Sequence, residues 1–329
     1  MIRGLASLGA AALLASSGAA AGTAPATAIF YYPWYGTPTR DAAWQHWQQN
    51  GAVPPRRVGS QFYPARGAYS SSDAAVVAAQ MKEIAAAGIG EVVVSWWGRG
   101  SAEDGRLPAV SAAARADGLA VAAHLEPYPG RTAVTVAADL AYLRGRGITD
   151  VYVYDSSAIS DADWASLNTG LTGMRLFANT ALAGKAAAGR FAGLYTYDVL
   201  VYGGGSFPRL CAQARRAHLL CAPSVGPGFD ARRATGEPRL RPRENGAEYD
   251  RMWSQALRAR APIVTITSYN EWHEGTQIEP ARPAPGYESY EGAWSLHGAA
   301  AETAYLDRTA YWIARLSRAR SPAGGGTPR

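Results

Sequence analysis

The chain has 329 residues, of which 48% are hydrophobic, and it carries a formal net charge of +6 at pH 7. This length suits one large domain or two ordinary ones, and an α/β barrel of roughly 250 residues counts as one domain. The basic residues are scattered and form no basic helix with interleaved aromatic side chains, so the composition does not favour nucleic-acid binding.

The N-terminal sequence MIRGLASLGAAALLASSGAAAGTAPA has the pattern of a secretory signal peptide. Arg3 precedes an apolar stretch from Leu5 to Leu14, and small residues at 19–21 suit a signal peptidase. A membrane anchor is the alternative, but the apolar stretch is shorter than the roughly 20 residues that span a bilayer. We therefore expect residues 1–22 to be removed and the protein to be secreted, periplasmic or on the cell surface, without stable membrane insertion.

Apolar, β-prone runs recur along the rest of the chain and alternate with helical patterns. The runs are rich in Val, Ile, Leu and Ala without strict alternation, which fits strands buried on both faces. The predicted strands are 28–34, 91–97, 119–127, 150–155, 174–180, 191–198, 218–224 and 261–270. The predicted helices include 73–88, 132–147, 161–171 and 247–261.

Eight strands that alternate with helices predict an α/β fold, a single-domain (β/α)8 TIM barrel over residues 27–320. An open doubly wound sheet is the alternative, but it would normally carry a glycine-rich phosphate turn, and no GxGxxG motif is present. The stretches 36–72 and 229–246 are expected to be long loops over the barrel mouth, after strands one and seven. We expect the tail at 321–329 to be disordered.

The two cysteines, Cys211 and Cys221, lie near the end of a predicted helix and in the next strand. In an oxidising compartment they could form a disulfide. Two separate buried thiols fit the same placement, so the sequence leaves the pairing open.

Polar and aromatic side chains gather where the predicted strands end. In a (β/α)8 barrel the carboxyl ends of all strands meet at one rim, and the reacting groups lie there. These residues are Tyr31, Tyr32, Trp34, Tyr35, Ser95, Trp96, Trp97, His124, Glu126, Tyr128, Tyr154, Asp155, Tyr195, Tyr197, Asp198, Asn270, Glu271, Trp272 and Glu274. They predict a pocket walled by aromatic rings and carboxylates, which suits a sugar better than a phosphate or a flat cofactor.

The segment TSYNEWHEGTQIEP, residues 267–280, places three carboxylates after the last predicted strand. Glycoside cleavage needs one carboxyl that protonates the leaving oxygen and a second that acts as base or nucleophile. Glu271 and Glu274 are three residues apart, so their Cα atoms lie at most about 10 Å apart. This spacing permits either the retaining or the inverting geometry. A solvated loop is the alternative, and for Glu279 the sequence does not choose.

Other chemistries find less support. An HExxH zinc motif would need histidine at position 277, which is Gln277. The remaining histidines show no ligand spacing, so we expect no metal and no cofactor, and we expect His273 to orient a neighbour or pack in the core. A G-x-S-x-G nucleophile elbow is absent. The expected partner is an oligosaccharide or polysaccharide, and the expected state is a monomer.

Six segments together resemble glycoside hydrolase family 99, the endo-α-1,2-mannosidases and endo-α-1,2-mannanases. They are FYYPWYG, VSWWG, LEPYPGR, YVYD, SVGPG and SYNEWHEGTQIEP, in order between residues 29 and about 281. The last segment is long and specific, whereas SWWG is shared with other barrels that cut α-glucans. The resemblance implies a (β/α)8 barrel that cuts inside α-mannoside chains, with retention of configuration and without a metal.

In the mechanism proposed for this family, a carboxylate deprotonates the 2-hydroxyl of the sugar. That oxygen displaces the leaving group to form a 1,2-anhydro sugar, while a second carboxyl supplies a proton. By motif position, Glu271 corresponds to the base and Glu274 to the general acid/base. If the pair works in this way, burial and the neighbouring charge of Glu271 should raise the pKa of Glu274.

The resemblance also implies substrate-binding residues. Asn270 and Glu126 correspond to residues that hold the sugar, Trp97 to an aromatic residue of the pocket, and Tyr195 or Tyr197 to a substrate-contacting tyrosine. Tyr35 and Trp272 are further candidates from the strand ends. A sugar-binding arginine would lie within 232–243, where the extra residues ATGEPRL depart from the family pattern.

Trp97 bears on the substrate, because it resembles the residue of bacterial mannan-cutting members, whereas animal glycoprotein-processing members carry tyrosine. A bacterial exported α-mannanase is therefore favoured over an enzyme that trims N-glycans. Two alternatives stay open: a glycosidase with another α-glucan or α-mannoside specificity, and a non-catalytic carbohydrate-binding barrel.

Overall fold

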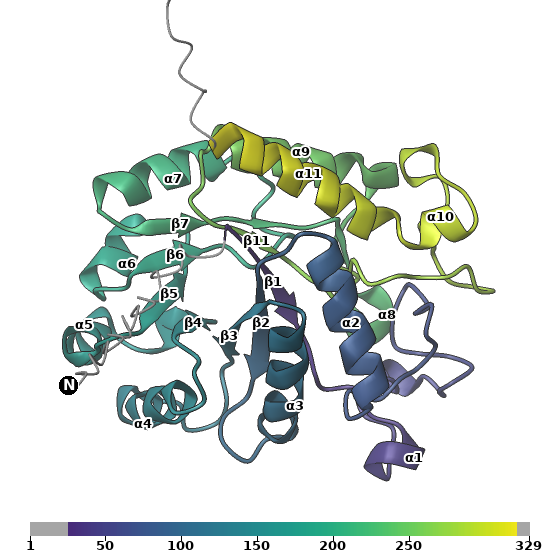
Figure 1. Ribbon diagram of the computed structural model, residues 1–329, viewed down its shortest axis with the longest axis horizontal. Helices are drawn as coiled ribbons and strands as arrows, with labels where there is room; N and C mark the ends of the chain where they lie inside the picture. Colours follow the sequence, from purple (N-terminus) through teal and green to yellow (C-terminus); the bar gives the residue numbers. More distant parts are fainter. Residues whose placement is uncertain (1–25, 321–329) are drawn as a thin grey trace, which may run out of the picture.

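The computed structural model describes residues 26–320, so the predicted signal peptide and tail lie outside it. Helices surround a parallel sheet that curls into a barrel (Figure 1). The strands are β1 (Thr27–Tyr31), β2 (Glu91–Trp96), β3 (Ala120–Leu125), β4 (Asp150–Val153), β5 (Arg175–Asn179), β6 (Gly193–Tyr195), β7 (Leu220–Ala222), β8 (Ser224–Val225) and β11 (Val264–Ile266). The main helices are α2 (Ala74–Ala86), α3 (Ala102–Ala116), α4 (Ala133–Arg144), α5 (Asp161–Gly170), α6 (Ala183–Ala188), α7 (Phe207–Arg216), α9 (Ala247–Arg258) and α11 (Ala304–Arg320).

The barrel closes at Pro223. The strand order is β7-β6-β5-β4-β3-β2-β1-β11-β8, and every neighbouring pair is parallel. Pro223 has no N–H for the ladder and separates β7, which pairs with β6, from its continuation β8, which pairs with β11. The nine segments are thus eight barrel strands, which confirms the predicted (β/α)8 fold.

Two of the predicted helices, α2 and α4, begin at residues whose side chains cap them. The Asp73 side chain accepts a hydrogen bond from Ala75 N at the start of α2, and Thr132 and Thr135 form a capping box at the start of α4. The predicted helices 161–171 and 247–261 are α5 and α9, each slightly shorter than predicted.

Aromatic side chains fill the barrel interior and form the floor of its mouth. Because side chains alternate across a strand, every second residue of β1 points inward, and Phe30 lies near the centre. The Phe30 ring centroid is 4.6 Å from that of His124, 5.0 Å from that of Tyr197 and 5.6 Å from that of Tyr195. The interior below the mouth is therefore a packed core, and space for a ligand is left at the carboxyl ends of the strands.

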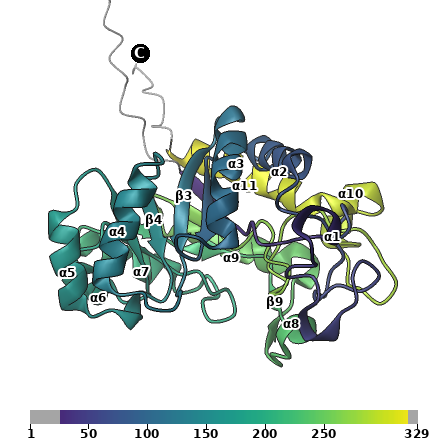
Figure 2. The same cartoon turned by 90° about the horizontal axis from the view of Figure 1, so that it is seen from below.

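The two predicted long loops lie side by side at the mouth. Residues 36–72 contain α1 (Pro38–Asp41) and the 3-10 turn η1 (Gln49–Gly51). Residues 229–246 contain β9 (Phe229–Asp230), α8 (Arg232–Thr235), β10 (Leu240–Arg241) and η3 (Glu244–Gly246). Figure 2 shows α1, β9 and α8 at the same end of the molecule. Asn50 Nδ2 donates to the Arg233 carbonyl at 3.3 Å, and Gln61 Nε2 donates to Asp230 Oδ1 at 3.2 Å, so the loops contact each other directly.

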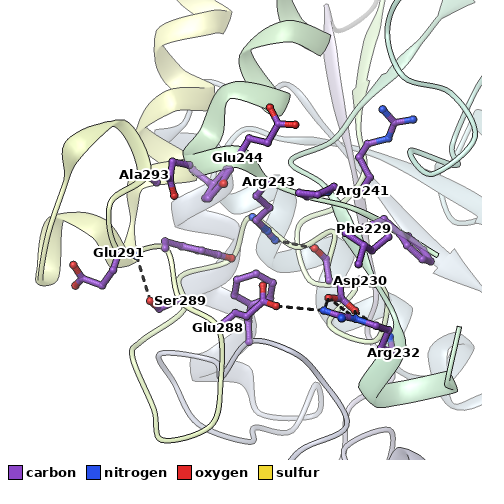
Figure 3. A pocket seen from close by; sticks show the side chains of 17 residues that line it. Phe229, Asp230, Arg232, Arg241, Arg243, Glu244, Glu288, Ser289, Glu291 and Ala293 are labelled. Carbon is purple, nitrogen blue, oxygen red and sulfur yellow. Dashed lines mark hydrogen bonds and ion pairs between the residues drawn. The ribbon is translucent and has the colours of Figure 1, made fainter. Parts of the chain in front are cut away.

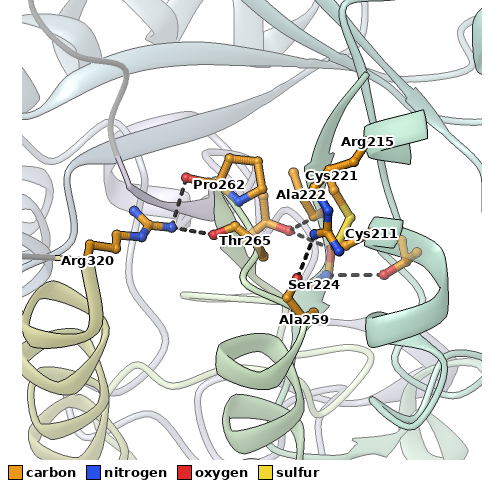
Figure 4. The surroundings of a disulfide bond; sticks show 11 residues. Cys211, Arg215, Cys221, Ala222, Ser224, Ala259, Pro262, Thr265 and Arg320 are labelled. Atoms are coloured by element: carbon orange, nitrogen blue, oxygen red, sulfur yellow. Dashed lines mark hydrogen bonds between the residues drawn. A yellow bond between two sulfur atoms is a disulfide. The ribbon is translucent and has the colours of Figure 1, made fainter. Parts of the chain in front are cut away.

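Cys211 and Cys221 are joined in a disulfide between α7 and β7 (Figure 4). Their Cα atoms are 5.3 Å apart, within the range that a disulfide spans. Nearby, Arg215 Nη1 donates to the Ala259 carbonyl at 2.9 Å, which ties α7 to the end of α9. The structure thus settles the pairing that the sequence left open.

Candidate active site

A cavity of about 140 Å³ opens at the carboxyl ends of the strands. Its wall is formed by residues that follow six different strands: Tyr32, Trp34, Trp97, His124, Glu126, Pro127, Tyr154, Tyr197, Glu271 and Glu274. The wall therefore combines aromatic faces with three carboxyl groups. Rings of this kind stack on the apolar faces of sugars, and carboxyl groups bind hydroxyls.

A closed turn after β11 brings Glu271 and Glu274 to this cavity. Ser268 N donates to the Thr276 carbonyl at 2.9 Å, and Ile278 N donates back to the Ser268 carbonyl at 2.9 Å. Inside the turn, Ser268 Oγ accepts from Glu271 N at 2.8 Å. The chain thus leaves the strand, forms the turn and returns, so both carboxyl groups reach one cavity although they are three residues apart.

Burial governs the ionisation of Glu271. It raises the pKa of this carboxyl well above its ordinary value, and the charge of Glu274 raises it further. His273 N donates to Glu271 Oε1 at 3.0 Å, which favours the ionised form. The His273 imidazole does not balance the charge at neutral pH, because burial lowers its pKa to about 4.

Glu274 is shifted in the same direction. Burial raises its pKa to about 8, with further contributions from the charges of Asp198 and Glu126. Tyr197 Oη donates to Glu274 Oε2 at 3.4 Å, and Tyr32 Oη donates to Tyr197 Oη. Because two neighbouring buried carboxyls do not both ionise readily, we expect the pair with Glu271 to hold one proton near neutral pH.

Glu126 completes the carboxylate wall from the end of β3. Ser95 Oγ donates to its Oε1 at 2.8 Å, and His124 Nδ1 lies 2.9 Å from the same oxygen. Trp34 and Trp97 also line the cavity, and the indole N–H of Trp97 is buried and has no hydrogen-bond partner within residues 26–320. Buried donors normally find partners, so the Trp97 N–H is available to a ligand.

The predicted substrate-binding residues divide into two groups. Trp97, Glu126 and Tyr197 lie in the cavity wall with the two catalytic candidates. Tyr35, Tyr195, Asn270 and Trp272 are fully buried behind it. For these four, contact with substrate stays a prediction.

The side chains of the second group bind other parts of the protein. Asn270 Oδ1 accepts from Tyr32 N at 2.7 Å, and its Nδ2 donates to the Tyr32 carbonyl at 3.0 Å, so Asn270 links the ends of β11 and β1. Tyr35 Oη donates to the Asn270 carbonyl at 2.9 Å and accepts from Trp272 N at 3.1 Å. Tyr195 Oη lies 2.8 Å from His124 Nε2, below the cavity. These residues support the wall from behind.

Five residues in the wall were not singled out as substrate-binding from the sequence: Tyr32, Trp34, His124, Pro127 and Tyr154. A usable signal was present in the alternation of side chains. Tyr32 and Trp34 are two residues apart, as are His124 and Glu126, so each pair shares one face of its strand. Once Glu126 is assigned to the mouth, His124 follows one layer below it.

Glu279 lies outside the cavity and is not solvated. It is fully buried and accepts hydrogen bonds from Tyr69 Oη, Gln80 Nε2 and Trp272 Nε1, each at 2.8 Å. Arg66 Nη1 lies 3.6 Å from its Oε1. Burial raises its pKa to about 7. Glu279 therefore links the end of the 268–278 turn to α2 and to the first long loop through hydrogen bonds.

The arginines of 232–243 do not contribute to this cavity in the described part of the chain. A separate cavity of about 300 Å³ is lined by Arg232, Arg241 and Arg243 (Figure 3). Gly275 of the 268–278 turn also lines this second cavity. Within residues 26–320, no group of three or more His, Cys, Asp or Glu side chains could hold a metal ion. A reaction without metal or cofactor stays an expectation.

Comparison with known proteins gives consistent similarities. A sequence model described as glycosyl hydrolase family 99 matches residues 24–318. A glycoprotein endo-α-1,2-mannosidase-like protein of Danio rerio is 33% identical over 88% of this chain and 78% of its own length. A glycoprotein endo-α-1,2-mannosidase of Xenopus laevis is 33% identical over 78% of this chain and 70% of its own length. The solved GH99 endo-α-mannosidase of Bacteroides thetaiotaomicron superposes with a TM-score of 0.81 at 29% identity, covering 90% of this chain and 99% of that one.

Proposed function

The chain belongs to glycosyl hydrolase family 99 and is an endo-acting glycoside hydrolase, and we propose that it cleaves internal α-1,2-mannosidic linkages with retention of configuration. The observation that carries the proposal is the pairing of Glu271 with Glu274 in one small cavity with aromatic walls. Relatives named as endo-α-1,2-mannosidases support the linkage.

In the first step, the Glu271 carboxylate takes the proton of the sugar 2-hydroxyl. The freed oxygen attacks C1 of the same sugar, the bond from C1 to the leaving oxygen breaks, and that oxygen takes the proton of Glu274. The products are a 1,2-anhydro sugar and the released part of the chain.

In the second step, the Glu274 carboxylate takes a proton from water, and the hydroxide oxygen attacks C1. The bond from C1 to O2 breaks, and O2 takes its proton back from Glu271. Each step inverts C1, so the two together retain its configuration, and both carboxyl groups return to their starting state.

The shared proton of the pair suits this exchange of roles. A general acid works best with a pKa near the working pH, and the pKa of about 8 keeps Glu274 protonated at neutral pH. The mechanism also needs Glu271 in its ionised form, which the His273 amide stabilises and which burial and the charge of Glu126 oppose. The proton that the pair shares must therefore lie on Glu274 when the reaction starts.

We further propose an exported bacterial enzyme that acts on α-mannan, with trimming of N-glycans as the weaker candidate. The position of Trp97 in the wall supports a role in substrate choice, and the disulfide supports an oxidising compartment. Within residues 26–320, no helix combines the length and apolar character needed to cross a membrane.

The test is to incubate the protein with yeast-type α-mannan, a glucosylated N-glycan and α-1,3-glucan, and to separate the released oligosaccharides. We expect oligosaccharides from α-mannan above all, with the α-anomer detected first by NMR. Release of single mannose units, or of the β-anomer first, would contradict the proposal. Binding of α-mannan without release of product would favour the carbohydrate-binding alternative.

A further inference from the structure

We propose that Arg243 is a positioning residue for Glu274: its guanidinium, held among three aromatic rings, fixes the backbone turn that carries this carboxyl group. The inference rests on the proposed role of Glu274 as acid. It assigns to the second long loop the task of shaping the active site from behind.

The first observation is a pair of hydrogen bonds. Arg243 Nη2 donates to the carbonyl of Gly275 at 2.9 Å and to that of Gln277 at 2.7 Å. Gly275 directly follows Glu274, so one nitrogen holds two carbonyls of the same turn at a fixed separation. Figure 3 shows Arg243 in the wall of the second cavity, which Gly275 also lines.

The second observation is the aromatic cage around the guanidinium. Its central carbon lies 4.5 Å from the centroid of Phe62, 4.9 Å from that of Tyr290 and 4.6 Å from that of Tyr305. Its buried Nε and Nη1 form no close ion pair with a carboxylate within residues 26–320, although the Tyr305 hydroxyl and the charge of Glu288 also interact with the guanidinium. The ring faces therefore supply the close contacts to the positive charge, which leaves Nη2 to bind the turn.

The third observation is a second anchor from the same loop. Asp230 N donates to the Glu274 carbonyl at 2.7 Å. Gly275 has φ +61°, and a Cβ there would lie 2.9 Å from the Asp230 carbonyl oxygen. The turn is thus enclosed between Asp230 and Arg243, and its tight shape requires glycine at 275.

The side chain of Glu274 has little support of its own. In the described part of the chain, the one side-chain hydrogen bond to its carboxyl group is the 3.4 Å contact from Tyr197. The position of the carboxyl therefore depends on the backbone turn. A displacement of about 1 Å from the reacting geometry can lower a rate about a hundredfold.

The experiment compares Arg243→Ala with Arg239→Ala on the mannan substrate. Arg239 belongs to the same loop, is mostly exposed and pairs with Glu237, so its loss controls for a missing loop charge. We expect Arg243→Ala to lower kcat about a hundredfold with KM within threefold of wild type. Arg239→Ala should match wild type in both.

A small cation should restore the lost contacts. The cavity of about 300 Å³ is lined by Arg243 and gives guanidinium access to the vacated site. We expect added guanidinium to raise kcat of Arg243→Ala at least tenfold and to leave Arg239→Ala unchanged. Hydrogen exchange of the peptide spanning 268–281 should be faster in Arg243→Ala and return toward wild type with guanidinium.

Folded Arg243→Ala with wild-type kcat would overturn the proposal, as would a loss of kcat with neither rescue nor faster exchange in 268–281. If Arg243→Ala does not fold, Arg243→Lys decides: the cage keeps its charge, but an ammonium does not reproduce the planar donor geometry, so we expect kcat at least tenfold lower at unchanged KM. Wild-type kcat in Arg243→Lys would overturn the proposal. If Glu274→Gln stays active, the proposed function fails separately, while the exchange data still report on the turn.

Discussion

Both ends of the barrel contain buried carboxyl groups with a raised pKa, but the surroundings of these groups differ. At the carboxyl end, burial raises the pKa of Glu274 to about 8, and the group borders a cavity shared with Glu271 and Glu126. At the amino end, burial raises the pKa of Glu91, the first residue of β2, also to about 8. The charge of Asp150 adds to the shift there.

The amino end is filled with protein. Tyr152 Oη donates to Glu91 Oε2 at 3.3 Å, and the Tyr152 ring stacks on Phe177 with centroids 4.6 Å apart. Arg175 Nε donates to Asp150 Oδ1 at 2.8 Å, which neutralises the second carboxylate. Glu91 therefore has neighbours that fix it, and it lines neither of the two cavities described above.

A raised pKa does not by itself identify a catalytic carboxyl. Glu279, with a pKa raised to about 7, is a third case, and its partners are protein donors throughout. What separates Glu274 from the other two is the cavity and a second carboxyl across it. The same substitution, glutamate to glutamine, should then have opposite consequences at the two ends.

The largest effect is expected at the cavity. Glu274→Gln removes the proposed proton donor and Glu271→Gln removes the proposed base, so each should lower kcat on α-mannan about 10³-fold or more. Neither change should lower the melting temperature, because each replaces a buried ionisable group by a neutral one of similar shape. Steady-state kinetics together with thermal unfolding check this.

Retention of more than about a tenth of the activity in either variant would contradict this prediction, because activity would then not depend on the carboxyl pair in the cavity. A loss of activity caused by unfolding would not report on the chemistry, so circular dichroism must show that both variants are folded. Glu91→Gln is the matched control and should keep kcat within about twofold of wild type.

The next effect is on stability, at the opposite end. Glu91 has a folded-state pKa of about 8, above its ordinary value of 4.5, so between these values the folded state binds more protons than the unfolded state. Stability from this group is therefore complete below pH 4.5 and is lost as pH rises toward 8. Glu91→Gln stays neutral and should raise the free energy of unfolding at pH 8 by roughly 2 kcal/mol, allowing for solvent relaxation.

Denaturant unfolding at pH 5 and pH 8.5 measures this directly. The advantage of Glu91→Gln over wild type should be small at pH 5 and larger at pH 8.5. An advantage of equal size at both pH values would mean that the carboxyl does not titrate in this range. Lower stability at both would mean that the Glu91 charge is needed by Arg175.

Much of the fold follows from the sequence, because most strands lie in largely apolar runs that alternate with helical patterns. The catalytic candidates follow too, since Glu271 and Glu274 come directly after such a run. The difference between Tyr195 and Tyr197 does not follow. They are two residues apart in the predicted strand 191–198, but β6 ends at Tyr195. Packing against Phe30 and His124 decides that Tyr195 is covered and that Tyr197 borders the cavity.

Contacts between residues far apart in the sequence limit the prediction of other features in the same way. Glu279 looks like a loop carboxylate until Tyr69 and Gln80, about 200 residues earlier in the chain, supply its donors. The disulfide requires the two Cα atoms to be close, and here they are 5.3 Å apart. Two cysteines ten residues apart need not be this close in another connection between a helix and a strand. Such contacts are set by the closed barrel and not by local pattern.

The smallest effect should appear in the pH dependence of catalysis. In the proposed mechanism Glu274 is the acid and must be protonated, so kcat/KM should fall about tenfold per pH unit above its pKa of about 8. The Tyr197 hydroxyl stabilises the ionised form of Glu274 and thereby lowers this pKa. Tyr197→Phe removes that donor and should move the alkaline limb to higher pH by a fraction of a unit, in addition to any loss of substrate contact.

Glu91→Gln again provides the contrast, because it should leave the alkaline limb in place while it changes stability over the same pH range. A pH–rate profile of wild type, Tyr197→Phe and Glu91→Gln separates the two carboxyls, although both titrate near pH 8. If Glu91→Gln moved the limb and Tyr197→Phe did not, the limb would report loss of folded protein and not the acid. The contrast works because catalysis depends on the protonation of a group that faces the substrate, whereas stability depends on any group that folding removes from water.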